Sequence, residues 1–244
     1  MNLILVPGFW LDGASWDQVA APLREAGHIV HALTLPGKES RAADRTGIRL
    51  RDHIDTVIEL VDSLPTGVVL VGHSGGGAIA HAVVDARPAA VARVIYVDSV
   101  PLGDGDVIND QLPVVNGEVP LPDWSVFGAE DLVDLTDELR ERFAAIAVPE
   151  PVGVTSDKQV LADERRYDVP ATVICCEFSA ETMRELIAEG HPYVAELAQL
   201  TNAQLVDLPT GHWPQFTRPR ELAAAILAAI SSPTTVHATA SPNQ

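Results

Sequence analysis

The 244-residue chain has few cysteines, few basic residues, few aromatic residues and no long apolar run. Its two cysteines, Cys175 and Cys176, are adjacent in a strand-like run, so their side chains should point to opposite faces of a sheet and not bridge each other. No other Cys or His stands at ligand spacing from them, which argues against a disulfide framework and a metal centre. Two buried thiols fit a reducing compartment, so we expect a cytoplasmic protein with no metal and no cofactor.

The shortage of basic residues is marked, with 16 Lys and Arg against 34 Asp and Glu and a formal net charge of −18. Such a charge disfavours nucleic acid and anionic membrane surfaces as partners. No apolar run reaches membrane-spanning length, and we expect no signal peptide before the first strand. The expected partner is a small-molecule substrate, with a homodimer left open.

The most informative stretch is residues 68–80, in which apolar residues stop at Gly72 and a small-residue helical pattern follows Ser74. Gly72 and Gly76 flank the serine at two residues on either side, where side chains would collide as strand and helix close. Such a turn strains the serine backbone and points its Oγ out of the sheet. The next N–H groups, starting with Gly75, lie at a helix N-terminus that stabilises a developing oxyanion. A phosphate-binding turn is the other interpretation, but no Lys follows the glycines.

Strands and helices alternate over most of the chain, which predicts an α/β fold with a mostly parallel, twisted sheet and helices on both faces. The expected strands are 3–6, 28–35, 68–73, 94–97, 170–176 and 204–208, and the expected helices are 16–26, 49–64, 78–88, 180–189, 192–200 and 219–230.

The alternation stops between residues 101 and 168, where Pro, Gly and acidic residues surround one helical segment at 129–145. We therefore expect a core built from residues 1–100 and 169–231, with 101–168 inserted as a cap. The Ser-, Thr- and Pro-rich stretch 232–244 is expected to be a disordered tail.

Reactive groups of a parallel sheet gather beyond the carboxyl ends of its strands, and Phe9, Ser74, Asp98 and His212 all follow expected strands. A serine hydroxyl needs an imidazole base, and that base needs a carboxylate to orient it. His212 stands between a glycine and Trp213-Pro214 after the last strand, which suggests a shaped loop.

At these residues the chain resembles the α/β-hydrolase superfamily along nearly its whole length. The similarity rests on Val6-Pro7-Gly8-Phe9-Trp10, Gly72-His73-Ser74-Gly75-Gly76 and Gly211-His212, in the family's order. Gly13-Ala14-Ser15-Trp16 and the helix end that follows are similar to the small esterase and hydroxynitrile-lyase-like branch. The resemblance implies that Ser74 is the nucleophile, that His212 is the base and that the N–H groups of Phe9 and Gly75 form the oxyanion hole.

The acid departs from the family pattern, because Ser179 stands where the family usually has Asp. Asp98, Glu177 and Glu181 are the carboxylates near enough to replace it. Asp98 is favoured, since some relatives take the acid from the end of the strand that follows the elbow helix, and since it keeps the order Ser, acid, His.

These features predict a cofactor-free serine hydrolase that cleaves a small, fairly apolar ester or lactone through an acyl-enzyme on Ser74. Two alternatives stay open: a lyase of the hydroxynitrile-lyase type and a catalytically inactive binding protein. Trp10, Trp124 and Trp213 are expected to line the substrate pocket, and His73 is expected to be a packed neighbour of the nucleophile.

Overall fold

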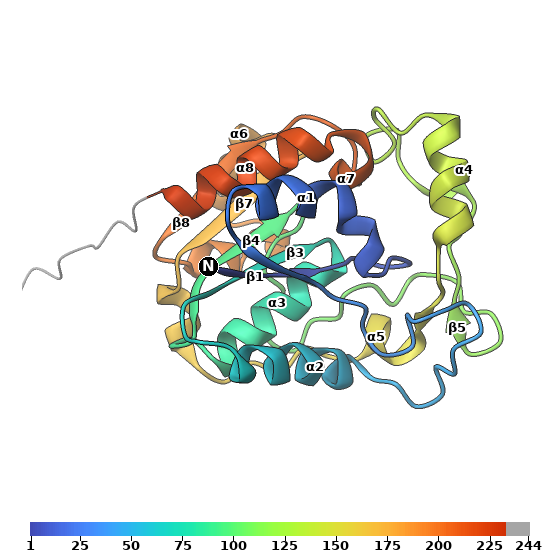
Figure 1. The fold of residues 1–244 in the computed structure, drawn as a ribbon, viewed down its shortest axis with the longest axis horizontal. Coiled ribbons are helices and arrows are strands. Elements are labelled where there is room, and N and C mark those ends of the chain that lie inside the picture. The colour runs from blue at the N-terminus through green and yellow to red at the C-terminus, as the bar shows by residue number, and fades with distance from the viewer. Residues whose placement is uncertain (233–244) are drawn as a thin grey trace, which may run out of the picture.

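The computed structural model describes residues 1–232, so the expected disordered tail lies outside the described residues except for Ser232. Six parallel strands form the central sheet, in the order β2-β1-β3-β4-β7-β8 (Figure 1). Their bounds are β1 Asn2–Val6, β2 Ile29–Ala32, β3 Val68–His73, β4 Val91–Val97, β7 Ala171–Cys175 and β8 Ala203–Asp207. The predicted parallel sheet is confirmed.

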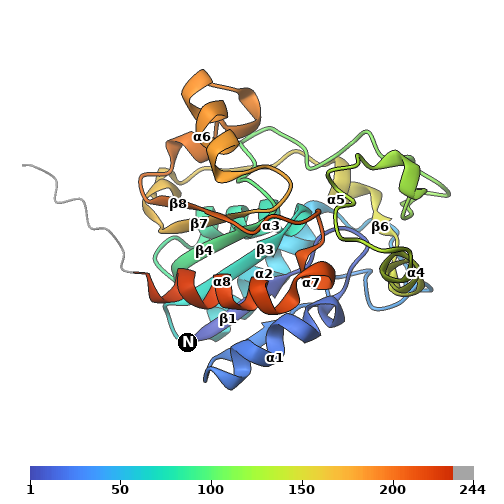
Figure 2. The same ribbon diagram turned by 90° about the horizontal axis from the view of Figure 1, so that it is seen from above.

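Helices cover both faces of the sheet, as predicted (Figure 2). One face carries α1 and α8, and the other carries α2, α3 and α6. Their bounds are α1 Asp17–Glu25, α2 Leu50–Ser63, α3 Gly75–Ala86, α6 Ala180–Glu189 and α8 Pro219–Ser231, with the short α7 Pro214–Thr217 before α8.

Alternation of side chains along the strands divides the core into two clusters. In β1, Leu3 and Leu5 face α1 and α8, where they meet Trp16 and Ile226. Ile4 and Val6 face the other way and pack with residues of α2 and α3. Successive strand residues point to opposite faces, so a short fully apolar strand supplies both clusters.

Residues between β4 and β7 form the irregular part of the structure, which lies at one side of the sheet with α4 at its outer edge (Figure 1). Its elements are β5 Glu118–Val119, η2 Trp124–Val126, α4 Asp137–Ile146, β6 Glu150–Pro151, α5 Val152–Ser156 and η3 Glu164–Asp168. We refer to residues 101–168 as the cap segment.

Two expected helices differ from the observed ones. The segment expected to be helical from residue 129 begins its helix only at Asp137, because Thr136 accepts a hydrogen bond from Leu139 N and caps the helix there. The stretch 192–200 forms two short 3-10 turns, η4 Pro192–Val194 and η5 Leu197–Gln199. Apolar periodicity alone did not distinguish these turns from a helix.

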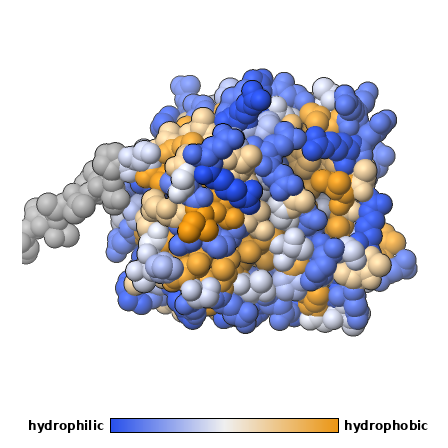
Figure 3. Space-filling model, viewed as in Figure 1, coloured by the Kyte–Doolittle hydropathy of each residue, from blue (hydrophilic) through white to orange (hydrophobic). Residues whose placement is uncertain are grey.

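The surface drawn in Figure 3 is mixed, with hydrophilic residues around smaller hydrophobic areas. Within residues 1–232, no helix combines the length and the apolar character that crossing a bilayer requires.

Candidate active site

Ser74 lies at the apex of a sharp turn between β3 and α3, with a φ of 52°. A Cβ on Gly72 would lie 2.4 Å from the carbonyl oxygen of Gly76, and a Cβ on Gly76 would lie 2.5 Å from that of Val6. The two glycines are therefore required by close backbone approach. The left-handed conformation of a non-glycine residue is costly and is typical of functional sites.

The loop after β1 passes directly beside this turn. A Cβ on Gly8 would lie 2.9 Å from Ser74 Cβ, and one on Gly75 would lie 2.8 Å from the Phe9 ring. Phe9 N has no acceptor in the part of the chain that the structure describes, and Gly75 is the first residue of α3, whose N–H has no intrahelical acceptor. Both N–H groups are free to bind an oxyanion beside Ser74.

A continuous set of hydrogen bonds links three of the residues expected in the site. His212 Nε2 lies 2.8 Å from Ser74 Oγ, and His212 Nδ1 lies 2.7 Å from Asp98 Oδ2. Asp98 itself has a φ of 43°, and its Oδ1 accepts hydrogen bonds from the N–H groups of Cys176 and Glu177. Although burial opposes ionisation, these contacts with His212 and Glu177 keep the pKa of Asp98 below its usual range.

Glu177 reaches the same imidazole nitrogen, with Oε1 at 2.7 Å from His212 Nδ1. This oxygen has no hydrogen-bond partner with good geometry among the described residues. Burial raises the pKa of Glu177, and nearby Asp98 and Asp131 add to the shift although His212 opposes it. Two carboxylates therefore face one N–H, and Asp98 is the one whose charge is stabilised by backbone donors.

The other two positions considered for the acid lie elsewhere. Ser179 caps α6, since its Oγ accepts a hydrogen bond from Thr182 N at 3.0 Å. Glu181 is exposed in the first turn of α6. The position that usually carries Asp in the family is therefore used in this chain to begin a helix.

The loop that carries His212 is held from two sides. His212 N donates to Asp131 O at 2.8 Å, and Gly211 N donates to Val133 O at 3.0 Å. On the other side of the loop lies His73, whose ring is fully buried. Its Nε2–H donates to His212 O at 2.6 Å. Burial, with His212 nearby, lowers the pKa of His73 to about 3, so this ring is neutral. His73 is a packed neighbour, as predicted, and it also supports the His212 loop.

A cavity of about 400 Å³ opens over Ser74 and His212. Trp10 and Phe127 line it, but Trp124 and Trp213 do not. Trp213 is 1% exposed and packs edge-on against Phe127 and Trp124, with ring centroids at 5.2 and 5.7 Å. The expectation that Trp124 and Trp213 line the pocket is therefore wrong, because a second layer of aromatic rings supports the cavity wall.

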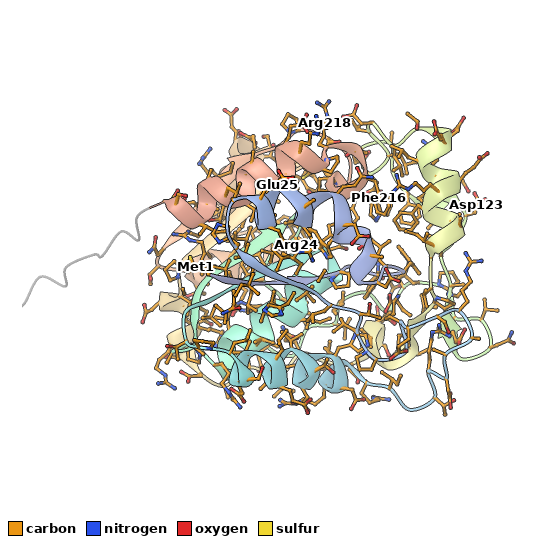
Figure 4. All side chains as sticks on the ribbon, in the orientation of Figure 1. Met1, Arg24, Glu25, Asp123, Phe216 and Arg218 are labelled. Carbon is orange, nitrogen blue, oxygen red and sulfur yellow. The ribbon has the colours of Figure 1, made fainter. Side chains whose placement is uncertain are left out.

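Arg218, between α7 and α8, forms a surface ion pair with the cap segment. Its Nη2 lies 2.8 Å from Asp134 Oδ2. Figure 4 labels Arg218 and also Phe216 of the preceding helix α7. Asp134 follows the residues whose carbonyls hold the His212 loop, so this ion pair joins the cap segment to the site.

Lys38 and Glu150 form a buried ion pair below the loop after β1, which no sequence pattern indicated. Glu150 Oε1 accepts from Trp10 N at 2.5 Å, and Lys38 Nζ donates to Val148 O at 2.9 Å. Val148 N in turn donates to Trp10 O at 2.9 Å, and Trp10 has a φ of 64°. The pair thus fixes the backbone immediately after Phe9.

Among residues 1–232, Asp98, Glu177 and His212 are the one group of His, Cys, Asp or Glu close enough together to share a metal ion. These side chains are engaged with one another and with Ser74.

The chain is also similar to known proteins. A model of the alpha/beta hydrolase family matches residues 3–225. The chain belongs to the α/β-hydrolase family. Over 93% of its length it is 27% identical to a carbendazim hydrolyzing esterase of a Nocardioides species, of which the match covers 98%. It is 26% identical to the lipase LipV of Mycobacterium tuberculosis over 92% of this chain and 91% of that protein.

Solved structures of the same fold include an extracellular α/β-hydrolase from a Paenibacillus species, with a TM-score of 0.74, 20% identity and coverage of 94% of this chain and 98% of that one. A methylesterase from Arabidopsis gives a TM-score of 0.73 at 18% identity, covering 95% and 99% of the two chains. These likenesses support the α/β-hydrolase fold.

Proposed function

We propose that this α/β-hydrolase is a serine hydrolase that cleaves a small, fairly apolar ester or lactone through an acyl-enzyme on Ser74. The observation that carries the proposal is the unbroken set of hydrogen bonds from Ser74 through His212 to Asp98. The esterase relatives support ester chemistry, and the cytoplasmic location expected from Cys175 and Cys176 is part of the same proposal.

In the first half-reaction, His212 Nε2 takes the proton of Ser74 as Oγ attacks the ester carbonyl. The N–H groups of Phe9 and Gly75 stabilise the oxyanion, and Asp98 stabilises the imidazolium. His212 then gives its proton to the departing alcohol oxygen, which leaves an ester on Ser74. Water, deprotonated by His212, cleaves that ester, and the acid product and free Ser74 result.

Covalent labelling tests the nucleophile. A fluorophosphonate should add one phosphonyl group to the wild type and none to Ser74→Ala, as measured by intact mass. Folded wild type that hydrolyses no ester and takes no label would contradict the proposal. Cyanide release from a cyanohydrin by such a protein would then favour the lyase, and ligand affinity unchanged in Ser74→Ala without turnover would favour a binding protein.

The pH dependence of kcat/KM should reflect the effect of Asp98 and Glu177 on the pKa of His212. Burial alone would lower the pKa of His212, but Asp98 and Glu177 raise it well above its ordinary value. His212 acts as a base only when it is unprotonated, so kcat/KM should fall as pH decreases through this pKa. Glu177→Gln removes one raising group, so the acid limb of kcat/KM should move to lower pH by about one unit. An acid limb that stays in place or moves to higher pH in Glu177→Gln would contradict the predicted effect of Glu177 on the pKa of His212.

A further inference from the structure

The first half of the cap segment is strongly one-sided in charge. Residues 101–136 contain no Lys and no Arg, and they contain eight carboxylates, which are Asp104, Asp106, Asp110, Glu118, Asp123, Glu130, Asp131 and Asp134. Glu118 and Asp134 pair with Arg45 and Arg218. Asp123 is on the cap side of the molecule in Figure 4. A cleft bordered by charges of one sign concentrates ligands of the opposite sign.

The cavity over Ser74 continues this pattern. In the part of the chain that the structure describes, its lining has two carboxylates, Asp98 and Asp131, and neither Lys nor Arg. Asp98 is engaged by His212, which leaves Asp131 as the carboxylate that can meet a ligand. The aromatic side chains of the lining are those of Phe9, Trp10, Phe127 and Tyr193.

Asp131 is held in place without being neutralised. Its Oδ2 accepts from Gly128 N at 2.6 Å, and its backbone oxygen accepts from His212 N. No Lys, Arg or His of the described residues forms an ion pair with it. Glu177 is an acidic neighbour of Asp131. Asp131 therefore presents a carboxyl group without a basic partner among the described residues in a half-buried, aromatic-lined cavity.

We propose that Asp131 makes this site selective for esters that carry a positively charged nitrogen and makes it disfavour esters that carry a carboxylate; this rests on the proposed serine hydrolase. Aromatic faces attract a cation, and a carboxylate a few ångströms from it adds a Coulombic attraction that weakens with solvent exposure. The same charge repels the carboxylate product of hydrolysis, so it also favours product release.

Three matched esters test the selectivity. The 4-nitrophenyl esters of 4-(trimethylammonio)butanoate, 5,5-dimethylhexanoate and glutarate share a three-methylene acyl chain and end in a cationic, a neutral and an anionic group. We expect the wild type to show kcat/KM at least about tenfold higher for the cationic than for the anionic ester. Asp131→Asn keeps the acceptor for Gly128 N and should reduce this ratio by about tenfold, mainly through KM.

Glu138→Gln is the matched control, because it removes one charge from an exposed position in the first turn of α4. Its ratio should equal that of the wild type. Equal kcat/KM for the cationic and anionic esters would overturn the proposed selectivity. So would a cationic-to-anionic ratio that Asp131→Asn leaves unchanged. In both cases turnover of the neutral ester would still support the proposed hydrolase.

Binding provides a readout that needs no turnover. The methyl esters of the same three acids, titrated calorimetrically into Ser74→Ala, should bind in the order cationic, neutral, anionic. The order should be lost in Ser74→Ala/Asp131→Asn and weakened by salt. If the wild type cleaves none of the esters, the hydrolase proposal fails. The titration still tests the selectivity, because equal affinities for the three methyl esters would overturn the role of Asp131.

Discussion

Asp98→Asn should lower kcat/KM for ester hydrolysis by about 10³-fold or more at neutral pH, whereas Glu177→Gln should not lower it. The amide oxygen introduced by Asp98→Asn can still accept from the two N–H groups that Asp98 binds. The amide nitrogen would, however, face His212 Nδ1 with a donor. The imidazole would then carry its proton on Nε2 and could not accept the proton of Ser74.

The double variant Asp98→Asn/Glu177→Gln separates the two carboxylates. Glu177 also lies 2.7 Å from His212 Nδ1, so it should retain part of the activity in Asp98→Asn. We expect the double variant to lose about tenfold more than Asp98→Asn alone. The measurement is kcat/KM with circular dichroism as a control for folding. A larger loss in Glu177→Gln than in Asp98→Asn would assign the acid to Glu177.

Lys38→Met should lower the free energy of unfolding by about 3–5 kcal/mol, because it leaves Glu150 as an unpaired buried charge. Both side chains are almost fully buried, at 1% and 2% exposure. Burial lowers the pKa of Lys38 although Glu150 opposes this shift, so the ammonium depends on its partner. Such a loss is a large part of the ~5–15 kcal/mol that stabilises a typical domain.

Two variants make this prediction specific. Lys38→Met/Glu150→Gln removes both charges and keeps an acceptor for Trp10 N, so it should recover more than half of the lost stability. Lys158→Met replaces the chain's other lysine, which is exposed, and should stay within about 0.5 kcal/mol of the wild type. Urea unfolding measures all three. Equal stabilities of Lys38→Met and Lys158→Met would show that the buried pair does not hold the loop.

Lys38→Met should also lower kcat more than it raises KM. The pair fixes the backbone of Trp10, and Trp10 directly follows Phe9, whose N–H we propose as an oxyanion donor. Loss of one well-placed oxyanion donor costs about 10²–10³-fold in kcat. The affinity for an uncharged ester depends less on that donor.

The sequence by itself determined the sheet and the elbow, because both depend on local patterns. Apolar strands ended by glycine, and helices with one apolar face, fixed the α/β alternation, and the glycines around Ser74 fixed the turn. The resemblance added the proposed role of His212 as the base. The loop position of His212 followed from its neighbours in the chain, and the structure brings it to Ser74 as expected.

Only the tertiary structure decided what depends on residues far apart in the chain. It showed that Asp98 and Glu177 share one nitrogen, that Ser179 begins a helix and that Trp213 lies behind the cavity wall. It also brought Lys38 to Glu150, 112 positions away. No local pattern marks such pairs, because their partners are chosen by the packing of the cap segment on the sheet, where burial makes each unpaired charge costly.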